Sequence, residues 1–328
     1  MNLRDPDPAR AAEIPGVIAR GCPTIKLFMR YPTYELPDDA LLRAMEQTAA
    51  AGGMAVVHAE NGPVVAELVR RREEAGIDGP GAWDDVSPPD MEGAAIHRAL
   101  ALARLARCPI LVFHVTSAEG VEELERARGR GQRAFGEALV HTLILDRSAY
   151  DDPDAGTAFM GTPPLRGERE REALWGALDR GRLDVVSTDH GPRRRERDES
   201  GRVRVPPGTS GIEVRLSLVH THGVVAGRIS RPRWVEVCCT APAVLHGLPG
   251  KGTLAPGQDA DIVLFDPAAE ATLTAPELHS AVDHATYEGM RVTGRPVAVL
   301  SRGEVLVEDG RLLGEPGRGR FLRRRLAA

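Results

Sequence analysis

The feature that most restricts the fold of this 328-residue sequence is the alternation of short apolar runs with amphipathic stretches from residue 20 to about 225. Four apolar runs are candidate strands, at 23–29, 53–59, 108–115 and 183–189. Helical periodicity fills the stretches between them, for example 38–51 and 91–106. This order is typical of a parallel sheet or an α/β barrel.

A different pattern begins near residue 250. Short alternating strands, punctuated by Gly, Pro and Asp, indicate a small β-sandwich part. We therefore predict an α/β fold in two parts, a barrel portion at 1–250 and a β-sandwich portion with a basic tail at 251–328. The tail, GRGRFLRRRLAA (317–328), is typical of a solvated or subunit-packing chain end.

Composition restricts the partners. The 42 basic and 47 acidic residues give a net charge of −5, and no basic stripe interleaves with aromatic residues as nucleic-acid binding requires. No apolar run reaches about 18 residues, and the polar, acidic first residues do not resemble a signal peptide. The four cysteines show no CxxC spacing. We expect a cytoplasmic protein with a small-molecule partner and with neither nucleic acid nor membrane.

Lysine is almost absent from the sequence. Only Lys26 and Lys251 are lysine, so 40 of the 42 basic residues are arginine. Lys26 lies inside the apolar run TIKLFM, whereas Lys251 lies in the turn GKG. A lysine kept inside an apolar strand of such a sequence indicates chemistry that a guanidinium cannot perform.

Four residues that can bind a metal or transfer a proton lie at the ends of the predicted strands: Lys26, His58, His114 and Asp189. Because barrel strands end at one face, we expect these residues to meet in one pocket about 10 Å across. Imidazole and carboxylate suit zinc and related ions. A lysine that has reacted with carbon dioxide carries a carbamate, which can bridge two ions about 3.5–4 Å apart. The pattern predicts hydrolysis of an unactivated amide, with Asp189 moving the proton.

Each of these residues also has a purely structural interpretation. Lys26 alone would be a strand-end lysine reaching solvent, and Asp189 alone would be a helix N-cap. His58 and His114 taken singly would be core or capping histidines. Their joint placement favours the metal site. The remaining histidines are assigned to packing, solvent or a supporting position: His97, His141, His190, His246, His279 and His284.

Several motifs occur in order along nearly the whole chain. They are KLFMRYP (26–32), VVHAENG (56–62), FHVTSAEG (113–120), GTPPLR (161–166), STDHGP (187–192), SGIEVRLSL (210–218), GTLAPGQDADIVLFDP (252–267) and YEGMRVTGRPVAVLSRG (287–303). Together they resemble the dihydropyrimidinase/hydantoinase family of the amidohydrolase superfamily. The HVTS form resembles this branch more than allantoinases or dihydroorotases, which remain an alternative.

The resemblance implies a partial TIM-like (β/α) barrel, about the last five strands, with a small C-terminal β-sandwich part. It also implies metal-dependent opening of hydantoin or 5,6-dihydropyrimidine rings, as in pyrimidine catabolism, with zinc or another divalent ion such as manganese. Lys26 would be the carboxylated bridging lysine, and His58 and His114 the ligands of one ion. Asp189 would be both ligand and proton shuttle.

The same resemblance assigns three substrate-binding residues. Tyr31 matches a tyrosine that hydrogen-bonds the oxyanion. Thr162 matches a serine near the ring amide of the substrate. Pro207 falls near an asparagine whose backbone holds the substrate, although a proline has no N–H to donate.

One family motif is absent. No His-x-His on a strand precedes Lys26, and the only such spacing is His220 with His222. By the family order the chain starts just before the fourth barrel strand. We therefore expect one tightly bound ion instead of two, and little activity of the chain alone. Exposed strand edges predict a homo-oligomer or a separate N-terminal chain. A non-catalytic assembly or scaffold relative is the alternative, but such a protein would be expected to lose several ligands.

Overall fold

The computed structural model describes residues 1–77, 79–197, 201 and 203–327. Its centre is a parallel sheet of five strands in sequential order, β1-β2-β3-β4-β5. The strands are β1 (Thr24–Phe28), β2 (Met54–His58), β3 (Ile110–Val112), β4 (Ala134–Leu139) and β5 (Val185–Ser187). Sequential parallel order is that of an α/β barrel segment. The described strands form an arc and do not close a ring, because β1 and β5 are not paired with each other.

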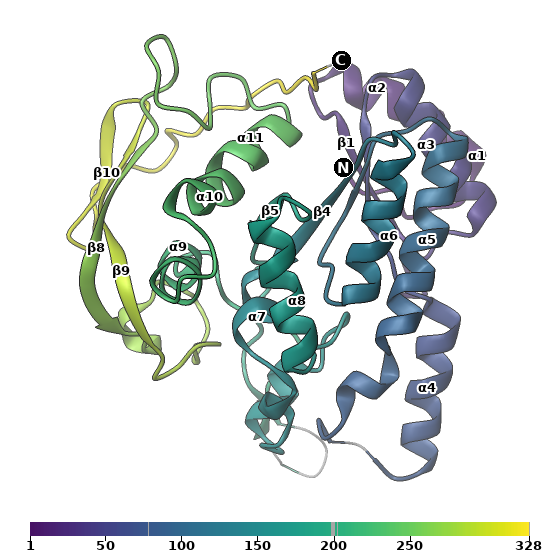
Figure 1. Cartoon of the computed structure of the whole chain (residues 1–328), viewed down its shortest axis with the longest axis horizontal. Helices are drawn as coiled ribbons and strands as arrows, with labels where there is room; N and C mark the ends of the chain where they lie inside the picture. The colour runs from purple at the N-terminus through teal and green to yellow at the C-terminus, as the bar shows by residue number, and fades with distance from the viewer. Residues whose placement is uncertain (78, 198–200, 202, 328) are drawn as a thin grey trace.

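Helices cover one face of this sheet, as Figure 1 shows. The helices of the parallel-sheet part are α1 (Pro8–Ala11), α2 (Ile14–Ala19), α3 (Asp38–Ala50), α4 (Gly62–Glu74), α5 (Pro89–Leu105), α6 (Ala118–Gly129), α7 (Val140–Ile144) and α8 (Glu168–Asp179). Short 3-10 turns are η1 (Trp83–Val86), η2 (Arg147–Tyr150), η3 (Ala155–Phe159) and η6 (Ala275–Glu277), and β6 (Glu196–Arg197) pairs with β7 (Val203–Arg204).

The alternation of side chains along β1 separates the core from the site. Ile25 and Leu27 are buried in the main core beneath the helices. Thr24, Lys26 and Phe28 point to the opposite face and line a cavity. The period of two along this strand therefore places Ile25 and Leu27 under the helices and turns Lys26 into the arc.

The predicted strands and helices were largely confirmed, with two corrections. Strand β4 was missed, because Gly136 and Glu137 interrupt its apolar run and remove the pattern that identifies a strand. Lys26 was expected at a strand end but occupies the centre of β1, level with Val56 of β2. Its long side chain is what brings the amine toward the carboxyl end of the sheet.

The C-terminal region forms one antiparallel sheet in the order β11-β10-β9-β8. Its strands are β8 (Ile262–Thr272), β9 (Arg291–Ser301), β10 (Glu304–Glu308) and β11 (Arg311–Leu312). Between the two sheets lie α9 (Arg215–Val219), α10 (Arg231–Val235) and α11 (Ala241–Leu245), with π-helical turns η4 (His220–Val225) and η5 (Glu236–Thr240) (Figure 1). The division near residue 250 remains a prediction.

His220, the first histidine of the His220-x-His222 spacing, serves packing. The Nδ1 atom of His220 lies 2.7 Å from the carbonyl oxygen of Thr293 on β9. The His220 ring also packs against Trp234 and Phe265, with centroids 5.1 and 5.0 Å away. This histidine joins η4 to the antiparallel sheet and lies outside the site described below. Among the described helices, none combines the length and apolarity needed to cross a membrane.

Candidate active site

One cavity of about 360 Å³ lies inside the arc of strands, and most of the predicted site residues line it. They are Lys26, Tyr31, His58, His114, Thr162 and Asp189. The structure therefore brings together six of the seven residues that the sequence singled out. Pro207 is the exception, because it is exposed and lines neither this cavity nor the smaller one beside it.

The imidazoles of His58 and His114 are neighbours at the centre of the site. Their ring centroids are 4.4 Å apart and the rings meet edge to face. Burial lowers the pKa of His58, and it lowers the pKa of His114 well below the usual value, because the charged form loses its hydration. Both rings are therefore neutral at pH 7, the form in which imidazole can ligate a metal.

Glu60 fixes the tautomer of His58. The Nε2 atom of His58 lies 2.7 Å from Oε2 of Glu60, and Arg30 Nη1 lies 3.1 Å from the same oxygen. Burial alone would raise the pKa of Glu60, but the hydrogen bond and charges of its partners lower it to about 2. Because an ionised carboxylate only accepts hydrogen bonds, Nε2 of His58 carries the proton and Nδ1 keeps a lone pair.

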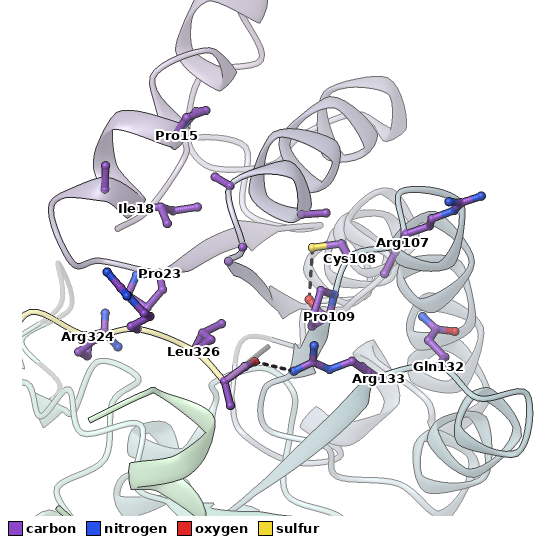
Figure 2. A pocket seen from close by; sticks show the side chains of 18 of the residues that line it. Pro15, Ile18, Pro23, Arg107, Cys108, Pro109, Gln132, Arg133, Arg324 and Leu326 are labelled. Carbon is purple, nitrogen blue, oxygen red and sulfur yellow. Dashed lines mark hydrogen bonds between the residues drawn. The ribbon is translucent and has the colours of Figure 1, made fainter. Parts of the chain in front are cut away.

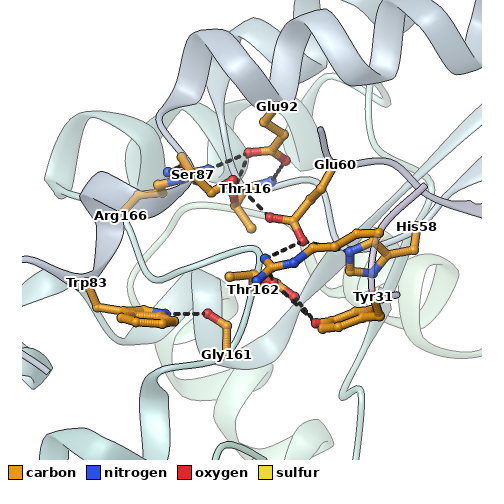
Figure 3. A network of polar contacts seen from close by, with 11 residues as sticks. Tyr31, His58, Glu60, Trp83, Ser87, Glu92, Thr116, Gly161, Thr162 and Arg166 are labelled. Atoms are coloured by element: carbon orange, nitrogen blue, oxygen red, sulfur yellow. Dashed lines mark hydrogen bonds and ion pairs between the residues drawn. The ribbon is translucent and has the colours of Figure 1, made fainter. Parts of the chain in front are cut away.

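A second polar network supports the backbone that follows His114 (Figure 3). Glu92 accepts hydrogen bonds from the backbone N–H of Thr116, at 2.7 Å, and from its hydroxyl, at 2.5 Å. Arg166 pairs with the same carboxylate at 2.9 Å and also donates to Thr116 and to the carbonyl of Ser87. All four residues are buried. The two networks meet at Ser87, whose hydroxyl donates to Glu60 at 2.9 Å.

The amine of Lys26 is held in an apolar, desolvated position. Its Nζ lies 3.7 Å from the centroid of the Phe113 ring and 4.9 Å from that of Phe28. Desolvation lowers the pKa of Lys26 to about 8, although the charges of Glu137 and Asp189 oppose the change. Near neutral pH a fraction of this amine is therefore uncharged, which is the form that reacts with carbon dioxide.

Tyr31 and Thr162 form one wall of the cavity. The two hydroxyl oxygens are 3.2 Å apart, and the Tyr31 hydroxyl is also 3.3 Å from the carbonyl oxygen of Thr162. Arg30 donates to the Thr162 hydroxyl. Burial raises the pKa of Tyr31, so the phenol remains a hydrogen-bond donor across the physiological range.

Three site residues have left-handed backbone conformations: Tyr31, His114 and Asp189, with φ of 69°, 40° and 43°. For a residue other than glycine, the left-handed conformation costs about 1–2 kcal/mol. The surrounding hydrogen bonds and packing hold these turns, which direct the three side chains into the cavity. Clustering of such conformations is typical of functional sites.

Sequence reasoning missed four polar residues around the site. Glu137 on β4 is buried, accepts from the backbone N–H of His114 at 3.4 Å, and has its pKa raised to about 7 by burial. Glu60 stands two residues after His58 in the VVHAENG motif, a spacing that could have identified it. His246 was assigned to packing or solvent but lines the cavity. His141 lines a smaller adjoining cavity of about 70 Å³ with Thr162, Asp189, Gly208 and Thr209.

The donor chemistry of the cavity fits a divalent cation. Two neutral imidazoles and a desolvated lysine amine face the same space, and a carboxylated lysine would add an anionic oxygen. Within the described residues, no group of three His, Cys, Asp or Glu side chains is arranged to hold an ion. The fit therefore depends on Lys26 being converted into a ligand.

Comparison with known proteins shows the family to which this chain is related. The amidohydrolase family model matches residues 93–306. The chain is 40% identical over 328 residues to a D-hydantoinase of Streptomyces coelicolor, covering 98% of this chain and 70% of that protein. A solved D-hydantoinase structure superposes with a TM-score of 0.94 at 37% identity, covering 99% of this chain and 72% of the other. The dihydropyrimidinase of Brevibacillus agri NCHU1002 superposes with a TM-score of 0.93 at 34% identity, covering 100% and 73%.

The chain therefore belongs to the amidohydrolase family, in the branch of the dihydropyrimidinases and hydantoinases. It is accordingly an enzyme of the cyclic amidohydrolase type.

Proposed function

We propose that this enzyme opens the ring of hydantoins or 5,6-dihydropyrimidines by adding water across the amide bond. The observation that carries the proposal is the convergence of Lys26, Tyr31, His58, His114, Thr162 and Asp189 on one cavity. The names of its relatives, D-hydantoinase and dihydropyrimidinase, support the same substrate class. A cytoplasmic, homo-oligomeric enzyme of pyrimidine catabolism remains our expectation.

The proposed metal centre uses His58, His114 and a carboxylated Lys26. A divalent ion such as zinc or manganese, when bound, lowers the pKa of its water and polarises an amide carbonyl. The hydrogen bond from His58 to Glu60 leaves Nδ1 available toward the cavity. Lys26 reaches its carboxylated state because its neutral amine, favoured by desolvation, adds to carbon dioxide and releases a proton.

The other residues handle the substrate and the proton. Asp189 accepts the proton of the attacking water and returns it to the ring nitrogen as the carbon–nitrogen bond breaks. Tyr31 donates a hydrogen bond to the oxyanion that forms on the attacked carbonyl. Thr162, which is already hydrogen-bonded to Tyr31 and Arg30, positions the ring amide.

The ligand count favours one tightly held ion. Three protein ligands are enough for an open catalytic site. His58, His114 and a carboxylated Lys26 would supply these three, and Asp189 lines the same cavity.

The test is ring opening of hydantoin and dihydrouracil by the purified chain, with zinc or manganese and bicarbonate. It is run with and without a polypeptide that supplies the N-terminal portion of a relative. Lys26→Arg should lower the rate by at least about a thousandfold, because a guanidinium cannot form the carbamate. Lys251→Arg is the matched control and should retain the rate, since Lys251 only pairs with Asp259 and Asp261 at the surface.

Two results would contradict this proposal. Retained activity in Lys26→Arg would remove the carbamate role, and an inactive mixture would remove the hydrolase assignment for these substrates. Metal analysis tests the single-ion statement separately. Two tightly held ions per chain with near-normal turnover would show the ligand count to be wrong.

A further inference from the structure

A second and larger recess lies at the opposite end of the parallel sheet, where the strands begin. It encloses about 1110 Å³. Its walls are the segments that precede β1, β2, β3 and β4, together with the C-terminal tail (Figure 2). In Figure 1 the yellow tail crosses from the antiparallel sheet to the region beside α2. Nothing in the proposed ring-opening chemistry uses this end of the molecule.

The recess is strongly cationic. Seven arginines line it, and no Asp or Glu is among its described lining residues: Arg104, Arg107, Arg130, Arg133, Arg323, Arg324 and Arg325. No salt bridge in the part of the chain that the structure describes involves any of the seven. The nearby Arg126 and Arg128 differ, since they pair with Glu122 and Asp184. An unpaired cluster of this kind stands out in a chain whose net charge is −5.

The tail is a fixed wall of the recess. The backbone N–H of Arg324 donates to the carbonyl of Gly21 at 3.1 Å, and that of Arg325 donates to Gly247 at 3.2 Å. The guanidinium of Arg324 donates to the Thr24 hydroxyl at 3.2 Å. Leu326 packs against the small apolar cluster on the inner face of the sheet. These contacts hold Arg324, with its neighbours Arg323 and Arg325, beside the start of the sheet.

Compensation of helix dipoles does not account for this much charge. Helices α2, α3, α5 and α6 end at this recess, and each C-terminus carries about half a negative charge, roughly 2 in total. Seven guanidinium groups exceed that several-fold. Arg104 and Arg130 fit the helix-end explanation, whereas the arginines of the tail belong to no helix.

We propose that this recess binds a small, multiply charged anion of the phosphate type, such as a short polyphosphate or a phosphorylated metabolite. Guanidinium groups bind phosphate oxygens in bidentate fashion, and several of them around one concave space favour a compact polyanion. No aromatic residue is among the described lining residues, so the recess offers no platform for stacked bases. That composition argues against single-stranded nucleic acid. The inference is independent of the ring-opening function.

The experiment is calorimetric titration of the full chain with inorganic tripolyphosphate at fixed ionic strength. We expect saturable binding with one site per chain. Arg323→Gln with Arg325→Gln should weaken it by at least about tenfold, because both residues line the recess and each substitution removes a guanidinium group. Arg291→Gln with Arg311→Gln is the matched control, since it removes the same charge from exposed positions on the antiparallel sheet. This control should change the affinity by less than about twofold.

The titration is repeated in the Lys26→Arg background, so that metal at the proposed catalytic site does not capture the probe. Binding that survives there supports the proposal. Equal weakening in the two double variants would reduce the effect to general charge attraction and overturn it. Non-saturating heats would do the same, as would stronger binding of a short single-stranded oligonucleotide than of tripolyphosphate.

Discussion

The two ends of the parallel sheet carry polar residues in opposite states. At the carboxyl end, His58, Glu60 and His114 are buried and held by short hydrogen bonds or by ring contacts. At the amino end, most of the arginines are exposed and none has a carboxylate partner among the described residues. Burial at one end shifts proton affinities and prepares groups for chemistry, while exposure at the other end leaves a field that attracts anions.

The same difference separates the only two lysines. Lys26 is desolvated beside Phe113 and Phe28, which lowers its pKa to about 8. Lys251 lies at the surface between Asp259 and Asp261, which raise its pKa. Environment, and not residue type, therefore decides which lysine can react with carbon dioxide at neutral pH.

The largest expected effect comes from breaking the buried pair of Arg166 and Glu92. Arg166→Met should lower the free energy of unfolding by about 3–5 kcal/mol, because it leaves the carboxylate charged and unpaired in the interior. Arg126→Met breaks exposed pairs and should cost no more than about 1 kcal/mol. Urea denaturation of both variants measures the difference. Equal losses would show that the carboxyl end is not held by buried ion pairs.

The two lysines should titrate far apart. Reductive methylation with ¹³C labels both amines, and NMR then follows each signal with pH. We expect the Lys26 signal to titrate near pH 8 and that of Lys251 above its ordinary value. If both signals titrated at the same pH, the amine of Lys26 would not be desolvated as proposed.

The lowered pKa of Lys26 also makes the free energy of unfolding depend on pH. The folded pKa of Lys26 lies below the unfolded value of 10.5, so the unfolded chain binds more protons between about pH 8 and 10.5. The contribution of Lys26 to stability therefore rises with pH across this window. Lys26→Met should remove that rise, whereas Lys251→Met should not.

The sequence predicted the residues that line the cavity better than it predicted the strands and acids that support them. Lys26, His58, His114 and Asp189 could be predicted because chemically distinctive residues followed or interrupted apolar runs. Strand β4 and its Glu137 could not, since a glycine and a carboxylate break the apolar run there. A buried acid is favoured at that position only by contacts with other strands, which no local pattern reports.

The cationic recess shows a second limit. Its arginines come from the ends of α5 and α6, the loops after them and the tail, and the first and last of them, Arg104 and Arg325, lie more than two hundred residues apart in the sequence. In the sequence each arginine is typical of an ordinary surface charge, and the tail is typical of a solvated or subunit-packing end. Only the tertiary contacts of Arg324 and Leu326 reveal that the tail returns to the sheet.

A smaller effect is expected from Glu60, which hydrogen-bonds His58 and is not itself one of the proposed metal ligands. Glu60→Gln should weaken zinc binding by about 10–100-fold, because the amide no longer fixes the ring as an ionised carboxylate does. Glu67→Gln removes an exposed acid that pairs only with arginines on α4 and should leave the affinity unchanged. Competition with a chelator measures both. A loss confined to stability, with unchanged zinc affinity, would make Glu60 purely structural.

The smallest predicted effect contrasts two arginines at the amino end. Arg107 has a left-handed backbone with φ of 53°, which costs a residue with a side chain about 1 kcal/mol. Arg107→Gly should therefore raise the free energy of unfolding by somewhat less than this, since glycine also gains entropy in the unfolded chain. Arg104→Gly removes the same charge from the same recess but lies in the last turn of α5, where glycine should cost about 1 kcal/mol. Urea denaturation measures the change in the free energy of unfolding for each variant. Changes of opposite sign would assign the difference to backbone conformation, because both variants lose the same charge. Two changes of the same sign would mean that charge repulsion among the arginines, and not the turn at Arg107, controls stability at this end of the sheet.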